Sequence, residues 1–405
     1  MSSSESSAPP ANLTPLNRPS EGIPEVINTP AGLRRAVRTL REGSGALAVD
    51  TERASGFRYG QRAFLIQIRR PGAGTWLIDP EAFEDLEVLQ EFMNEQSWIL
   101  HAASQDLPCL HELGLYPVEL YDTELAGRLA GMPRVGLGTM VAELLGIELA
   151  KEHSAVDWST RPLPESWLSY AALDVEVLHE LRDAIAKVLE EQGKTEYARQ
   201  EFEFTRTMPD PQPADEPWRK LPGLARIKRR KQLAVARELW LARDALARSR
   251  DVAPGKLLND KAIMATLPQP PRTVPALLQI NGFHGRSAKR DAPRWLEAIG
   301  RGLASTDLPE PSVNRGMPQN VRSWGDKNPK AAERLGQARQ VLAELSEQVQ
   351  IPTENLLTPR FLRQLCWDAS DGMQVEAVAE FLRHLGAREW QIELVATPLA
   401  EALSS

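Results

Sequence analysis

Two carboxylates, Asp50 and Glu52, end a short apolar run in residues 46–53 (ALAVDTER). Glycines on both sides of the run make it typical of a buried β-strand. Side chains two residues apart along a strand point the same way, so both carboxylates are expected to face one spot. Like charges at that distance repel unless a cation lies between them, and carboxylate oxygens suit Mg²⁺ or Mn²⁺. The alternative is a strand that simply becomes solvent-exposed at its end, because Asp-X-Glu is a common sequence.

Further acidic residues follow other expected element ends. Asp106 comes just after a strand expected at 98–102, where ligand-facing groups of open α/β sheets tend to gather. Capping is the alternative for Asp106, because an Asp before a helix is usually an N-cap. Asp122 precedes a helix expected at 124–130 and is interpreted as a cap alone.

Tyr170 and Asp174 form a third candidate pair. They are four residues apart in an expected helix and therefore share a face. The apolar residues of that helix place this face toward the interior, where an ionised carboxylate needs a partner or a metal. The alternative is that Asp174 lies at the solvent edge of the helix.

The elements that position these residues form an α/β layer domain. Three apolar runs separated by turn residues predict a meander, and a fourth strand and several amphipathic helices follow. A mixed sheet with helices on its faces is the expected architecture. The expected strands cover 46–53, 64–68, 75–79 and 98–102, and the expected helices cover 83–93, 107–113, 124–130 and 166–188.

The order Asp-X-Glu, Asp, Tyr-X-X-X-Asp resembles the three motifs of DEDD-superfamily exonucleases, and the surrounding residues resemble the ribonuclease D family. Ser169 occupies the place where the histidine subgroup has its His, so the tyrosine subgroup is the better match. The resemblance covers roughly residues 25–200 and implies a ribonuclease H-like mixed sheet flanked by helices. The segments that carry it are 49–52 (VDTE), 101–107 (HAASQDL), 121–123 (YDT), 157–163 (DWSTRPL) and 170–175 (YAALDV).

The resemblance implies a two-metal-ion 3′→5′ exoribonuclease that uses Mg²⁺ or Mn²⁺ and releases nucleoside 5′-monophosphates. By this likeness, Asp50 would bridge two ions about 4 Å apart. Glu52 and Asp174 would complete the site of the ion that binds the attacking water, and Asp106 would hold the second ion. Tyr170 would orient the water. The implied substrates are RNA 3′ ends, such as those of tRNA precursors.

Charge is distributed unevenly along the chain. Residues 1–205 contain 18 Lys and Arg against 32 Asp and Glu, a net of −14. Residues 206–302 contain 20 against 9, a net of +11, and residues 303–405 contain 10 against 14, a net of −4. An acidic block followed by a basic one suits a metal-dependent catalytic domain joined to a polyanion-binding module, although charge segregation also serves solubility.

Proline-rich breaks divide the chain into three folded blocks. The two C-terminal blocks resemble tandem helicase-and-ribonuclease-D C-terminal (HRDC) domains, the second more weakly. They look like a diverged repeat at an offset of 99, which matches Leu257-Leu258 with Leu356-Leu357. The expected divisions are a disordered tail at 1–24, the exonuclease domain at 25–206, a linker at 207–217, HRDC domain 1 at 218–303, a linker at 304–326 and HRDC-like domain 2 at 327–403.

The basic middle block contains a cluster that could make sequence-independent phosphate contacts. A solvated helix start is the alternative for the same charges. The cluster consists of Arg226, Lys228, Arg229, Arg230 and Lys231.

Two alternatives to an exoribonuclease stay open at this point: a DNA 3′→5′ exonuclease and a non-catalytic RNA-binding protein. Cys109 and Cys366 are far apart and lie in no metal-like spacing, which favours a reducing cytoplasm. No apolar run approaches the ~20 residues that span a bilayer. No membrane association and no obligate protein partner are expected.

Overall fold

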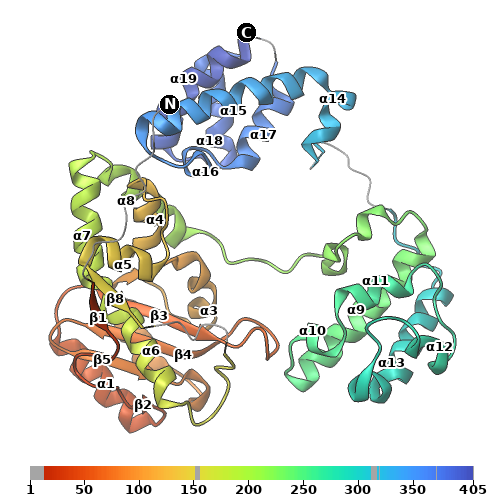
Figure 1. Cartoon of the computed structure of the whole chain (residues 1–405), viewed down its shortest axis with the longest axis horizontal. Helices are drawn as coiled ribbons and strands as arrows, with labels where there is room; N and C mark the ends of the chain where they lie inside the picture. Colours follow the sequence, from red (N-terminus) through yellow and green to blue (C-terminus); the bar gives the residue numbers. More distant parts are fainter. Residues whose placement is uncertain (1–12, 151–155, 312–316, 319, 371, 405) are drawn as a thin grey trace.

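The protein is described by a computed structural model with three blocks of secondary structure, of which the first two are joined by the extended segment 208–216 (Figure 1). We call them the first block (residues 13–207), the middle block (217–304) and the last block (317–404). Within the described part, no helix has the length and apolar character needed to cross a membrane. The described residues are 13–150, 156–311, 317–318, 320–370 and 372–404.

A six-stranded mixed sheet forms the centre of the first block, in the order β2-β5-β4-β3-β6-β7. β3, β4 and β5 form the predicted antiparallel meander, and β6 and β7 continue the sheet parallel to β3. The mixed sheet flanked by helices is therefore confirmed. Its strands are β2 (Val26–Ile27), β3 (Leu47–Arg53), β4 (Ala63–Arg70), β5 (Gly74–Ile78), β6 (Ser97–Leu100) and β7 (Glu119–Asp122).

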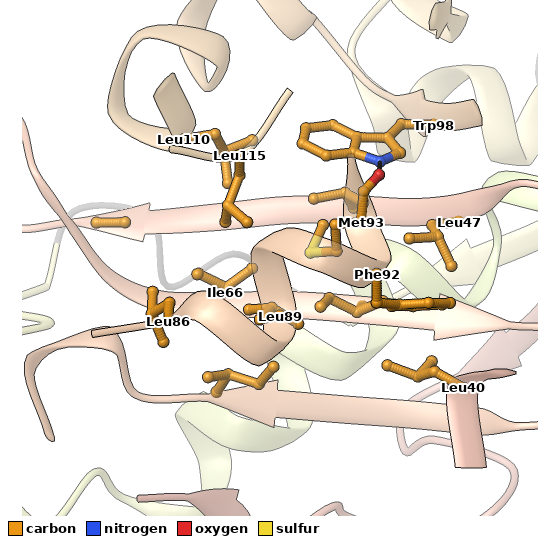
Figure 2. Packing of buried hydrophobic residues seen from close by; sticks show 14 of the residues in the cluster. Leu40, Leu47, Ile66, Leu86, Leu89, Phe92, Met93, Trp98, Leu110 and Leu115 are labelled. Carbon is orange, nitrogen blue, oxygen red and sulfur yellow. Dashed lines mark hydrogen bonds between the residues drawn. The ribbon is translucent and has the colours of Figure 1, made fainter. Parts of the chain in front are cut away.

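One face of the sheet is covered by α1, α2 and α3 (Figure 2). Leu89, Phe92 and Met93 of α2 pack against this face, and the Trp98 indole donates a hydrogen bond to the Met93 carbonyl at 3.1 Å. The apolar spacing of α2 gives a single buried stripe, as expected for a helix that covers a sheet. These helices are α1 (Pro30–Glu42), α2 (Glu87–Met93) and α3 (Leu107–Glu112).

The opposite face carries the remaining helices of the first block. α6 packs on β3, β4 and β5, while the others form a second core with Ala48 and Ile99. These helices are α4 (Thr123–Leu129), α5 (Leu137–Leu145), α6 (Glu165–Glu176), α7 (Leu178–Glu191) and α8 (Thr195–Thr207).

Two expectations for this block are wrong. The single helix predicted at 166–188 is broken at Val177, because α6 packs on the sheet whereas α7 packs on α4 and α5. Within the predicted disordered tail at 1–24, β1 (Thr14–Leu16) pairs in parallel with β8 (Ile147–Leu149). Leu16 and Ile147 also pack against the second core, so the start of the described chain is part of the fold.

The middle and last blocks are helical and repeat one pattern. In each, a 21-residue helix ends at a left-handed residue, Asp251 (φ 48°) or Gln350 (φ 52°), 99 positions apart. A four-residue helix and an extended leucine follow in both. The helices are α9 (Arg230–Arg250), α10 (Pro254–Leu257), α11 (Asp260–Thr266), α12 (Val274–Leu278) and α13 (Gly285–Ala304), then α15 (Pro329–Val349), α16 (Thr353–Leu356), α17 (Pro359–Asp368), α18 (Val375–Leu385) and α19 (Glu389–Ser404).

The last block packs directly on the first. Arg388 forms an ion pair with the buried Glu201 carboxylate, whose Oε1 also accepts from the Trp390 indole at 2.8 Å. Trp390 stacks on Tyr197 with ring centroids 4.8 Å apart. Trp324, which lies in the predicted linker at 304–326, is buried in the core of the last block.

Candidate active site

Three acidic residues from two elements meet on the α6 face of the sheet. Leu47 and Val49 pack into the opposite core, so the alternating residues Asp50 and Glu52 face α6. α6 brings Asp174 to the same place. Ligand atoms of Asp50, Glu52 and Asp174 all lie within 4.8 Å of one another. The geometry agrees with the prediction that Asp50 and Glu52 point to one spot, and it adds Asp174 from α6 to that spot.

Burial makes this cluster electrostatically costly without a cation. Desolvation, and then the charges of Asp50 and Asp174, raise the pKa of Glu52 to about 10. Desolvation and neighbouring carboxylates also raise the pKa of Asp50 well above its ordinary value. A bound cation would reverse both effects by favouring the ionised carboxylates. The donors are hard oxygens, which fits Mg²⁺ or Mn²⁺.

Asp106 lies beside this group but is held by a different set of contacts. It follows η2 (Ala103–Gln105) and is buried. The Thr51 hydroxyl, on the opposite face of β3, donates to Asp106 Oδ1 at 2.6 Å, and Arg53 Nη2 lies 3.8 Å from that oxygen. Burial raises the pKa of Asp106 to about 6, against the lowering effects of Thr51 and Arg53. Among the described residues, the 4.8 Å group consists of the other three carboxylates.

Tyr170 lines the same pocket from α6. The pKa of its phenol is raised further above the ordinary value near 10. Desolvation is the main cause, followed by the charges of Asp174 and Glu52 and by a hydrogen bond with Asp174. Tyr170 therefore remains a neutral hydroxyl at physiological pH and can position a reactant rather than remove its proton. The buried indole of Trp158 lies 6.4 Å from the Tyr170 ring and supports it.

The carboxylates open into a pocket of about 1130 Å³ that contains two residues missed by sequence reasoning. Among the described residues that line the pocket, Arg53 is the one that carries a permanent positive charge. His101 is kept neutral, because burial lowers its pKa to about 4. Arg53 directly follows the Asp-X-Glu motif in the sequence. Its position next to the motif could have identified it as a candidate residue of the pocket.

Asp122 caps α4 as expected and also holds the turn that leads to Asp106. Its Oδ1 accepts from two amides of α4 at 3.0 and 3.2 Å. The same carboxylate accepts from the amides of Ala102 and Ala103 at 3.0 and 2.9 Å. Ala102 has a left-handed φ of 61°, an uncommon conformation for a residue with a Cβ. Asp122 thus stabilises the turn just before Asp106.

The five basic residues predicted to contact RNA are all exposed near the start of α9. Lys231 Nζ donates to the Leu303 carbonyl in the last turn of α13 at 2.9 Å and to the Ser305 carbonyl just after it at 2.8 Å. Arg230 forms an ion pair with Glu310 at 2.9 Å. These two side chains therefore help to attach the segment that follows α13, and a role in RNA contact stays a prediction. The cluster is Arg226, Lys228, Arg229, Arg230 and Lys231.

The raised pKa of Glu52 gives a measurable dependence of stability on pH. The folded protein without metal binds the proton of the Glu52 carboxyl more tightly than the unfolded chain does. The protonated carboxyl therefore contributes its full stabilisation of the fold below about pH 4.5, and this stabilisation is lost as the pH rises toward 10. In EDTA, we expect Tm to fall between about pH 5 and pH 9 by more than roughly 4 °C. Mn²⁺ should raise Tm more at pH 8 than at pH 5.

Differential scanning fluorimetry of the wild type and Glu52→Gln checks this expectation. The variant lacks the titrating carboxyl, so its Tm should vary less with pH and respond less to Mn²⁺. Equal pH dependence in the two proteins would show that Glu52 is not the group responsible.

Comparisons with known proteins agree with this geometry. A family model described as "3'-5' exonuclease" matches residues 24–190. The HRDC domain model matches residues 232–299. A model described as "3' to 5' exonuclease C-terminal domain" matches residues 316–403. That the last block is a second HRDC-like domain stays a prediction.

Individual relatives extend the likeness to most of the chain. Ribonuclease D of Pseudomonas paraeruginosa is 30% identical over 308 residues, which are 73% of this chain and 81% of that protein. A protein from Bifidobacterium adolescentis with a known crystal structure is 36% identical in sequence to this chain. The two structures match with a TM-score of 0.88, and the match covers 97% of this chain and all of the other. Escherichia coli RNase D, described as an exoribonuclease involved in structured RNA processing, is 25% identical with a TM-score of 0.71, over 94% and 98% of the two chains.

Proposed function

Because the chain belongs to the ribonuclease D family and is a 3′→5′ exoribonuclease, we propose that its acidic cluster holds two divalent cations, Mg²⁺ or Mn²⁺. The observation that carries this proposal is the meeting of Asp50, Glu52 and Asp174 in one pocket with Tyr170. Bound cations would act as Lewis acids on the phosphodiester and lower the pKa of the attacking water.

We assign the residues as follows. Asp50 would serve both cation sites, because it lies near both Asp106 and Asp174, whose charges act on it. Glu52 and Asp174 complete one site, and Asp106 serves the other. Tyr170 holds the attacking water through its neutral hydroxyl. The leaving 3′-oxygen stays with the shortened RNA, and the product is a nucleoside 5′-monophosphate.

Structured RNAs with 3′ extensions, such as tRNA precursors, are the proposed substrates. The description of E. coli RNase D as a structured-RNA exoribonuclease supports this choice. The net charge of +11 over residues 206–302 supports binding of RNA phosphates. We also propose a cytoplasmic location, where the buried free thiols of Cys109 and Cys366 would remain reduced.

Trimming of matched substrates tests the proposal. RNA labelled at its 3′-terminal nucleotide, a DNA oligomer of the same sequence and a tRNA with a short 3′ extension are incubated with Mn²⁺, Mg²⁺ or EDTA. We expect labelled 5′-monophosphate from RNA with either metal, little from DNA and none in EDTA. Faster trimming of DNA than of RNA would favour the DNA exonuclease alternative, and activity in EDTA would refute the metal assignment.

Arg53 is expected to contact the RNA anion that enters the pocket. Its side chain is 25% exposed and lines the pocket together with the carboxylates of the acidic cluster. A charge-assisted hydrogen bond is worth about 1.5–3 kcal/mol, so Arg53→Gln should raise KM for RNA roughly 10-fold or more. Steady-state kinetics check this, with Arg53→Lys as the variant that retains the charge. A fall in kcat at constant KM would indicate instead that Arg53 acts through Asp106.

A further inference from the structure

One wall of the active-site pocket is a loop that the first block does not hold alone. Residues 54–62, which we call the rim loop, connect β3 to β4 directly after the Asp50–Glu52 motif. Ser55 and Gln61 of this loop line the pocket together with the carboxylates. Inside the loop, the amides of Phe57 and Arg58 both donate to the Ala54 carbonyl, at 2.8 and 2.7 Å. These bonds shape a turn, and contacts from outside fix its position.

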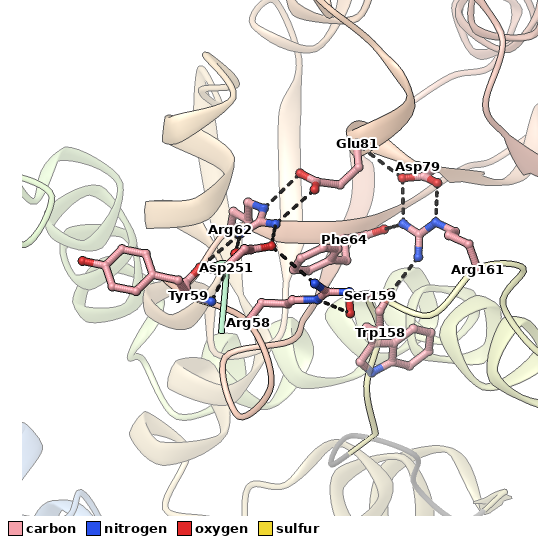
Figure 3. A network of polar contacts seen from close by, with 10 residues as sticks. All are labelled: Arg58, Tyr59, Arg62, Phe64, Asp79, Glu81, Trp158, Ser159, Arg161 and Asp251. Carbon is pink, nitrogen blue, oxygen red and sulfur yellow. Dashed lines mark hydrogen bonds and ion pairs between the residues drawn. The ribbon is translucent and has the colours of Figure 1, made fainter. Parts of the chain in front are cut away.

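Within the first block, the Glu81 carboxylate accepts from Arg62 at 3.1 and 3.2 Å. The middle block supplies further contacts from the junction of α9 and α10. The Ala253 amide donates to the Phe57 carbonyl at 3.0 Å. The Asp251 carboxylate accepts from the Tyr59 amide at 3.3 Å and from both terminal nitrogens of Arg62, at 3.0 and 2.8 Å (Figure 3). Backbone and side chains of the rim loop are thus bound to a segment about 190 residues later in the chain.

Aromatic residues of the rim loop make a second set of contacts with the same helices. The Tyr59 hydroxyl donates to Asp244 at 3.0 Å and accepts from Arg248 at 3.1 Å. The Lys256 ammonium lies 3.8 Å from the centre of the Phe57 ring, within the range of a cation–π interaction. The middle block therefore contacts the loop at several points.

Arg58 extends this network toward the catalytic tyrosine. Its Nη1 lies 3.7 Å from Asp251, and its Nε donates to the Ser159 hydroxyl at 2.7 Å. Ser159 neighbours Trp158, the buried indole that lies 6.4 Å from Tyr170. Asp251 is therefore connected both to the rim loop, which lines the pocket, and to the segment that contains Ser159 and Trp158 (Figure 3).

We propose that Asp251 is a positioning residue for the hydrolytic reaction and that the middle block holds one wall of the catalytic pocket, the rim loop, in place. The side chains of Arg62 and Asp251 are 31% and 38% exposed, so one such ion pair alone would hold the loop weakly. Asp251 accepts paired hydrogen bonds from Arg62 and also lies near Arg58, and backbone amides add further hydrogen bonds. Together these contacts fix the orientation of the rim loop relative to the middle block. Displacement of the loop would move Ser55 and Gln61 relative to the carboxylates.

This inference rests on the proposed function, and a substrate of minimal length tests it. A dinucleotide has only the scissile phosphodiester, so it lacks the further phosphates that a basic RNA-binding module would contact. If Asp251 positions the pocket wall, Asp251→Asn should lower kcat roughly 10-fold on a dinucleotide and on a long single-stranded RNA alike, because small displacements of reacting groups are costly. Asn suits the test because it tolerates the left-handed backbone at this position.

Two further variants sharpen the result. Asp251→Glu keeps the carboxylate and should recover part of the lost kcat. Asp307→Asn weakens a more exposed contact away from the rim loop, the 2.8 Å pair between Arg237 of the middle block and the segment that follows α13. It should behave like the wild type on both substrates. Tm of Asp251→Asn and Asp307→Asn, measured with Mn²⁺, should stay close to that of the wild type.

The outcomes separate the inference from the proposed function. A loss confined to long RNA and expressed in KM would show that the middle block contributes RNA affinity alone, which overturns the inference. Unchanged kinetics of Asp251→Asn on both substrates would overturn it as well. A wild-type protein that hydrolyses neither substrate with Mn²⁺ or Mg²⁺ would refute the proposed function itself.

Discussion

Asp50→Asn is expected to reduce RNA hydrolysis by at least about 10³-fold, the largest effect of any single substitution in this chain. The charges of both Asp106 and Asp174 raise the pKa of Asp50, so Asp50 lies close to both carboxylates. The amide keeps the size of the side chain but removes the charge that both proposed cation sites need. Release of 5′-monophosphate from 3′-labelled RNA, measured with Mn²⁺, gives the size of the loss.

The accompanying measurements show whether this loss is chemical. Removing one of several repelling carboxylates should leave the metal-free protein at least as stable, so Tm in EDTA should not fall. RNA binding in EDTA, measured by fluorescence anisotropy, should also persist. Asp183→Asn is the matched control, because this exposed carboxylate lies outside the pocket and pairs with Arg182. Residual activity of Asp50→Asn within 10-fold of the wild type would remove Asp50 from the proposed bridging role.

Tyr170→Phe is expected to lower kcat roughly 10²-fold, the lower end of what a positioned proton-transfer group contributes. Its phenol has a raised pKa and is held by Asp174, so the lost function would be the orientation of the attacking water. KM for RNA should change little, because the ring that packs near Trp158 is retained. Single-turnover kinetics with saturating enzyme measure the chemical step directly.

The pH profile offers an independent check on Tyr170. If the hydroxyl orients water while remaining protonated, the wild type and Tyr170→Phe should give kcat–pH profiles of the same shape between about pH 6 and pH 9. The two curves would then differ only in height. A basic limb that is present in the wild type and lost in Tyr170→Phe would show that the phenol ionises during turnover, contrary to this role.

Much of the first block could be predicted because its signals are local. The meander from β3 to β5 is encoded by apolar runs separated by glycine-containing turns, and these predictions are confirmed. The break at Val177 has no such signal, since neither Gly nor Pro occurs there. It arises because α6 and α7 cover different neighbours. β7 escaped prediction for a related reason, because four residues that end at a helix cap give little periodicity.

The candidate site shows the same division. Strand alternation and helical spacing predicted the shared direction of Asp50 and Glu52 and the shared face of Tyr170 and Asp174. Asp106 has no such local constraint. Its position depends on Thr51, which lies 55 residues away and on the other face of β3. The sequence identified Asp106 as a candidate, and only the packed sheet shows that it stands apart from the 4.8 Å group.

The chemical groups of this protein can be read from its residues alone: which carboxylates and which hydroxyl are available, in what order, and on which faces of their elements. The tertiary structure decided which distant residues surround them. Arg53 faces the acidic pocket, and Asp251 reaches the rim loop from 189 residues beyond Arg62. The physical reason is that alternation, helical spacing and capping act over a few residues, whereas such long-range contacts form only when the whole chain packs.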